Sequence, residues 1–193
     1  MYDNDSLDKL HQGPLRTLEP IHIMDYTSTL YVRACGPASY GCGSTDVEAG
    51  RGWQGAYSTW TVHMADNHDS NEVVKVGDKV VLRCLGNLDY MFTCNSDTEC
   101  SLYPGGHRVS TNSMYAPLNA HFTIQHVDKS IKIGTPIDLT KQIFLHSLAS
   151  GGPNNGTIQW CGNNQNGCGG LAMRSDLRPR EVAEADPSSK WTL

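Results

Sequence analysis

A phrase framed by two cysteines recurs three times in this chain of 193 residues, and it constrains the fold more than any other feature. The clearest copy, WCGNNQNGCG, occupies residues 160–169. CGPASYGCG at residues 35–43 has the same Cys-Gly start and the same Gly-Cys-Gly end. A weaker copy runs from Cys94 to Cys100 and lacks the glycines. A unit this distinctive is an internal repeat, and repeats decide an architecture before local propensities do.

The repeats extend beyond the cysteines. Apolar residues alternate upstream of each pair, and they make Ile21, Val80 and Ile137 equivalent positions. Each unit then closes on an aromatic-led phrase, and the leading aromatics are Trp60, Phe122 and Trp191. These patterns predict a loosely packed N-terminal arm, residues 1–17, and one domain, residues 18–193. Within the domain the repeats fall at about 18–72, 73–130 and 131–193.

The local patterns predict strands almost throughout. Residues 59–64 alternate as a closing strand, and residues 73–85 read as a hairpin built around Gly77 and Asp78. Residues 179–185 form the only helix-compatible stretch, which Pro187 ends after less than two turns.

Three such units, each with a Gly-x-x-Val-x-Leu type of phrase, a hairpin and a Trp-x-Ile/Val phrase, resemble the β-trefoil superfamily over about residues 18–193. The resemblance implies an all-β fold of three repeats, with about four strands each and pseudo-threefold symmetry. It also implies that Trp60, Phe122 and Trp191 lie in a shared core. Trefoils include lectins, Kunitz-type protease inhibitors and cytokines, so the fold does not choose a function.

The seven cysteines bear on the cellular compartment. Their spacing favours disulfides across hairpins, and hence an oxidising compartment, over zinc ribbons, whose cysteines lie two to four apart in sets of four. Cys84 is left over, either as a buried free thiol or as a bridge between two chains of a homodimer. The expected pairs are Cys35 with Cys42, Cys94 with Cys100, and Cys161 with Cys168.

Composition and motifs exclude several functions. A formal net charge of −5 without a basic stripe argues against nucleic-acid binding. No apolar run approaches the roughly 20 residues of a membrane span, and the polar start has no signal peptide, so a disulfide-bonded chain would be a mature secreted form. Nucleophile-elbow, phosphate-loop and zinc-protease motifs are lacking. The eight histidines are interpreted as strand-flanking surface residues.

Polar loops beside aromatic residues indicate sugar recognition, because aromatic faces stack on C–H groups while polar side chains pair with hydroxyls. Asp46 and Glu48 are also candidate calcium ligands. The asparagine-rich run reads equally well as a solvated turn. The candidate carbohydrate-binding residues are Asp46, Glu48, Arg51, Trp53, Asn163, Asn164, Gln165 and Asn166.

The expected function is therefore a secreted, non-catalytic lectin that binds glycans, of the galactose type, on glycoproteins or cell surfaces. The chain departs from ricin-type lectins because it has no Gln-x-Trp triplet. The first alternative is a Kunitz-type inhibitor, with a scissile arginine at Arg51 or within residues 178–180. The second is a receptor-binding cytokine, which the negative charge disfavours.

Overall fold

Thirteen β-strands of one antiparallel sheet make up most of the regular structure in the computed structural model. It describes residues 13–25, 30–34, 47–51, 55–94, 106–113, 118–149, 156–160, 173–176 and 180–193. Helical segments there are short, as predicted: α1 (Arg180–Ala185) and the 3-10 turns η3 (Gly55–Ser58), η4 (Leu118–Ala120) and η5 (Pro187–Ser189). None of these helices is long and apolar enough to cross a membrane. The all-β prediction is confirmed.

Seven of the strands form a ring through their pairings. Each strand pairs with the next in the order β1, β5, β6, β9, β10, β13 and β2. The chain itself completes the ring, because only two residues separate β1 from β2. The ring strands are β1 (Pro20–Ile21), β2 (Met24–Asp25), β5 (Trp60–Met64), β6 (Lys79–Cys84), β9 (Phe122–His126), β10 (Ile143–Ser147) and β13 (Trp191–Thr192).

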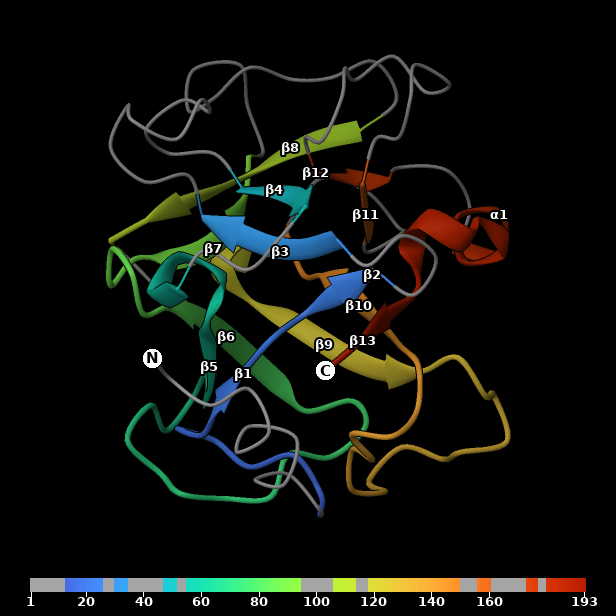
Figure 1. The fold of residues 1–193 in the computed structure, drawn as a ribbon. Coiled ribbons are helices and arrows are strands. Elements are labelled where there is room, and N and C mark those ends of the chain that lie inside the picture. The colour runs from blue at the N-terminus through green and yellow to red at the C-terminus, as the bar shows by residue number, and fades with distance from the viewer. Residues whose placement is uncertain are drawn as a thin grey trace.

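Three hairpins extend from one end of the ring. Their first strands pair with β2, β6 and β10, and β8 of the second hairpin pairs with β12 of the third. Figure 1 shows β4, β8 and β12 at the upper end, whereas the connection between β5 and β6 lies at the lower end. The hairpin strands are β3 (Leu30–Ala34) with β4 (Val47–Arg51), β7 (Tyr90–Thr93) with β8 (Gly106–Asn112), and β11 (Thr157–Trp160) with β12 (Met173–Asp176).

The predicted core aromatics lie at matching positions in the ring. Trp60, Phe122 and Trp191 have no exposed surface, which confirms their assignment to the core. Both indoles donate across to a hairpin strand: Trp60 Nε1 to the carbonyl of Val32 (2.8 Å), and Trp191 Nε1 to that of Ile158 (3.1 Å). A buried indole N–H needs such an acceptor, whereas phenylalanine needs none.

The predicted equivalence of Ile137 with Ile21 and Val80 is wrong. Ile21 pairs with Trp60 and Val80 with Phe122, but the partner of Trp191 is Ile143. The alternation before the third unit contains two apolar positions six residues apart, and the sequence pattern selected the earlier one.

Ile137 instead belongs to a cycle of three backbone hydrogen bonds. Leu15 N donates to Ile137 O (2.9 Å), Ile137 N to Val74 O (2.9 Å), and Val74 N to Leu15 O (2.8 Å). All three side chains are fully buried. Two expectations fail here. Residues 14–17 pack into the domain rather than forming a loose arm. Residues 73–76 contact the segments around residues 16 and 136 rather than pairing with β6 as a hairpin.

Candidate functional site

Most of the predicted sugar-binding residues fall outside the part of the chain that the structure describes. These are Asp46, Trp53 and residues 163–166. The two described candidates lie in β4: Arg51 stands opposite Leu30, and Glu48 stands opposite Arg33. The fold therefore places these two residues in one hairpin at the upper end of the molecule.

Glu48 is held by Arg33, a residue that the sequence did not single out. Arg33 Nε donates to Glu48 Oε1 (2.6 Å), and Arg33 Nη2 reaches the same oxygen. The two side chains are only 10% and 13% exposed, so the pair is poorly screened by water. A Cβ at Gly50 would overlap the guanidinium, which explains the glycine. Oε1 is therefore engaged by a guanidinium, which disfavours it as a calcium ligand.

The cysteine predictions are tested in part by the described residues. Cys94 is disulfide-bonded, with its partner outside the described residues, so pairing with Cys100 stays a prediction. Cys84 is a free thiol with no exposed surface. Burial raises its pKa. A bridge between two chains through Cys84 is therefore incompatible with this fold.

Polar residues of the second and third repeats come together where β8 pairs with β12. His107 stands opposite Ser175, and Arg108 opposite Arg174. β12 follows the connection that contains residues 163–166, whereas β8 belongs to the second hairpin, which carries none of the predicted sugar-binding residues. This pairing therefore places polar residues of two repeats on adjacent strands at the upper end of the molecule.

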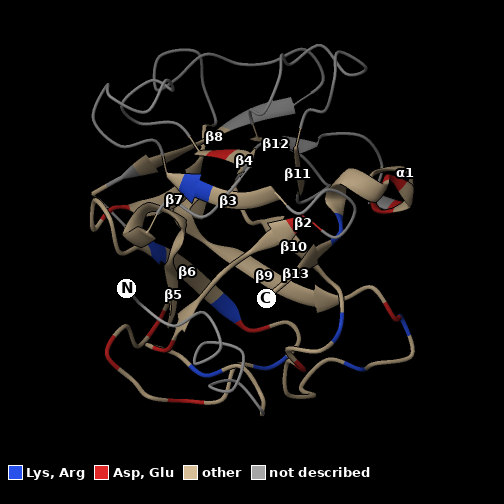
Figure 2. Cartoon of the chain, viewed as in Figure 1, with Lys and Arg blue, Asp and Glu red and all other residues tan. Residues whose placement is uncertain are grey.

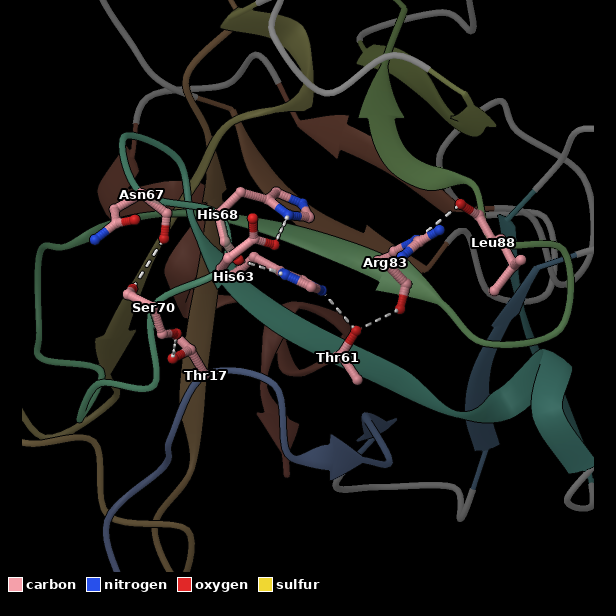
Figure 3. A network of polar contacts seen from close by, with 9 residues as sticks. Thr17, Thr61, His63, Asn67, His68, Ser70, Arg83 and Leu88 are labelled. Atoms are coloured by element: carbon pink, nitrogen blue, oxygen red, sulfur yellow. Dashed lines mark hydrogen bonds and ion pairs between the residues drawn. The ribbon is translucent and has the colours of Figure 1, made fainter.

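A network of polar contacts centres on His63 (Figure 3). His63 Nδ1 donates to the carbonyl of His68 (2.9 Å), and the Thr61 hydroxyl lies 2.8 Å from His63 Nε2. The rings of His63 and His68 stack with centroids 4.0 Å apart, and Tyr90 meets both by its edge. Burial lowers the pKa of His63 and outweighs the hydrogen bond to the His68 carbonyl, which raises it. This network fastens the loop 65–72 to β5.

The interpretation of the histidines as surface residues is wrong for three of them. His63, His126 and His146 are 5%, 5% and 1% exposed. Sequence spacing missed this, because it does not reveal partners from other parts of the fold, such as the His68 carbonyl for His63 and Glu184 for His146.

His146 takes part in an arrangement with the residue types of a hydrolase triad. Its Nδ1 lies 3.3 Å from the Thr157 hydroxyl, and its Nε2 lies 3.5 Å from Glu184 Oε1. Lys129 Nζ, 3.1 Å away, pairs with the other oxygen of Glu184. Thr157 and His146 are each 1% exposed, so a substrate has no route to the hydroxyl. The arrangement anchors α1 to the ring strands.

Two of the arginines proposed as the scissile residue of an inhibitor lie in regular structure rather than on a free loop. Arg51 ends a paired strand, and Arg180 begins α1. An inhibitor needs an exposed, rigid loop around its scissile residue. Arg178 lies outside the described residues.

A cavity of about 340 Å³ opens at the lower end of the molecule, between the loop 65–72 and the turn that precedes β6. Most of its lining side chains are charged or polar, and four of them, at positions 66, 67, 72 and 79, are exposed. Besides Gly77, the lining residues are Met64, Asp66, Asn67, Glu72, Asp78 and Lys79.

Comparisons with known proteins identify similar folds but no function. No protein-family model and no curated protein matches the chain. A Caenorhabditis elegans protein of unknown function matches with a TM-score of 0.68 and 12% identity, over 95% of this chain and 97% of that one. The SDF2-like protein from Arabidopsis thaliana matches with a TM-score of 0.66 and 13% identity, over 93% and 94%. The chain therefore shares its overall fold with both proteins.

Proposed function

We propose that the chain is a β-trefoil of three repeats and that it works as a secreted, non-catalytic lectin. Three matched features support the trefoil. Each third of the ring carries one hairpin, a buried aromatic residue recurs at each third, and Leu15, Val74 and Ile137 donate to one another in a cycle. Pseudo-threefold symmetry accounts for all three.

The lectin proposal rests on one observation, the gathering of the hairpins at one end. Asp46 and residues 163–166 belong to the connections within the first and third hairpins, Glu48 and Arg51 lie in β4, and Trp53 follows β4. β8 joins the third hairpin to the second. Loops presented together on a rigid scaffold are the usual location of binding residues. Polar and aromatic groups there would bind hydroxyls and C–H faces of a glycan.

Two further observations support a secreted binding protein over an enzyme. Cys94 is disulfide-bonded, and disulfides persist mainly in oxidising compartments. The triad-like group around His146 is closed to substrates.

A glycan array with and without chelator tests the proposal. The protein is first confirmed to be folded and disulfide-bonded by non-reducing mass spectrometry. We expect selective binding, which Trp53→Ala weakens and Trp160→Phe, at a partly buried position, leaves intact. Loss of binding with chelator, reproduced by Asp46→Ala, would identify calcium at Asp46. A blank array with folded protein would reject the lectin, and serine-protease inhibition would be assayed next.

A further inference from the structure

We propose that the lower-end cavity is a second ligand site, for a small polyhydroxylated molecule that carries an ammonium group, of which an amino sugar is the simplest example. The site is independent of the hairpin end. The loop 65–72 and β6 form it at the opposite end of the molecule (Figure 1).

The cavity has the dimensions of a small-ligand site. Its volume of about 340 Å³ lies at the lower limit of the roughly 300–1,000 Å³ of such sites. This favours one sugar-sized unit over an extended chain.

The net charge of the lining residues indicates the sign of charge that a ligand should carry. Asp66, Glu72 and Asp78 carry three negative charges against the single positive charge of Lys79, so the lining residues sum to minus two. Figure 2 shows both signs of charge along the lower loops. A ligand with a positive group is therefore preferred over a neutral one, and an anion is disfavoured.

These charged groups have hydrogen-bonding capacity to spare. Among the described residues, Lys79 forms no ion pair, and neither do Asp66 and Glu72. Only Asp78 is engaged, because its Oδ2 accepts from Lys75 N (2.8 Å). No three acidic or histidine side chains of the described residues gather closely enough to hold a metal ion. The carboxylates are thus spread around a volume, which suits a ligand with several hydroxyl groups.

Each type of lining group has a partner in an amino sugar. Carboxylates accept hydrogen bonds from hydroxyls and from the ammonium group, and such charge-assisted bonds are the stronger ones. Lys79 donates to a hydroxyl or ring oxygen. Met64 supplies a polarisable apolar surface for the C–H face of the ring.

Contacts from three elements hold the walls in place. Glu72 N donates to Thr17 Oγ1 (2.8 Å), and the Thr17 hydroxyl donates to the carbonyl of Ser70. His63 holds the middle of the loop through the carbonyl of His68. Gly77 makes the opposite turn at φ +90. These contacts hold the backbone of the site, so ligand binding has to order only the exposed side chains.

Amide shifts of the ¹⁵N-labelled protein, titrated with glucosamine at neutral pH, test the site. We expect shifts at residues 66–67, 72 and 77–79. Binding of glucose should be about tenfold weaker, because it lacks the ammonium group, and Glu72→Gln and Asp66→Asn should each weaken glucosamine binding about fivefold. Asp69→Asn is the matched control. It removes the same charge from the same loop, but the Asp69 side chain is fully exposed and does not line the cavity.

The proposal is overturned if glucosamine shifts no cavity amide, if glucose binds as tightly, or if Asp69→Asn weakens binding as much as Glu72→Gln. Each variant's amide spectrum reports whether it is folded. The amide shifts locate the bound ligand, so failure of this site and failure of the hairpin-end proposal are read from different residues.

Discussion

His63 stacks on His68 with the ring centroids 4.0 Å apart, and it donates a hydrogen bond to the backbone carbonyl of the same residue. The stack is favourable while the His63 ring is neutral. The stack also holds the loop 65–72, which forms one wall of the lower-end cavity. Protonation of His63 should therefore destabilise that loop.

Stability should fall as the pH drops below 6.5. Burial lowers the pKa of His63 from 6.5, and this outweighs the hydrogen bond to the His68 carbonyl, which raises it. The unfolded chain then takes up the proton first, so stability is complete above pH 6.5 and is lost as the pH falls towards the lower folded pKa. Denaturant unfolding of the wild type and His63→Gln measures this as a difference in pH slope. Parallel slopes through that window would contradict it.

Replacing Trp191 by phenylalanine should lower the free energy of unfolding by about 1–2 kcal/mol, because the carbonyl of Ile158 then loses its buried donor. Trp160→Phe is the control. Its Nε1 is buried without a partner among the described residues, so its removal should change stability little. Chemical denaturation of both variants gives the comparison. Equal losses would mean that the indole hydrogen bond does not matter.

Gly77→Ala should destabilise the protein by about 1–2 kcal/mol, because Gly77 has φ +90 and L side chains avoid that region. The new Cβ would also lie 3.1 Å from Ile133 Cγ2. Gly13→Ala introduces the same methyl group where no atom lies within 4 Å and φ is not left-handed. Melting temperatures should separate the two variants, and a neutral Gly77→Ala would show that the turn tolerates a side chain.

The Cys84 thiol should resist a thiol reagent in the native protein and react on unfolding. It is fully buried, and burial raises its pKa, so both access and thiolate are lacking. Absorbance with Ellman's reagent, with and without denaturant, measures this. Rapid native labelling, or a dimer on a non-reducing gel that Cys84→Ser abolishes, would contradict the buried position.

The repeat pattern predicted the all-β class and the core positions of Trp60, Phe122 and Trp191, because an aromatic residue that closes each unit points inward at the same place. It failed at Ile137, where two apolar positions compete and only the backbone cycle with Leu15 and Val74 decides between them. It also missed Arg33 and the buried histidines. Their partners come from other strands and loops of the fold, and no local periodicity encodes such contacts.

The central claim is that a glycan binds at the hairpin end, and amide shifts induced by the strongest ligand from the array test it most directly. We expect shifts along β4 and β12, at residues 47–51 and 173–176, with the fully buried core residues of the ring unmoved. Shifts confined to the lower-end cavity, or none at all with folded protein, would contradict it.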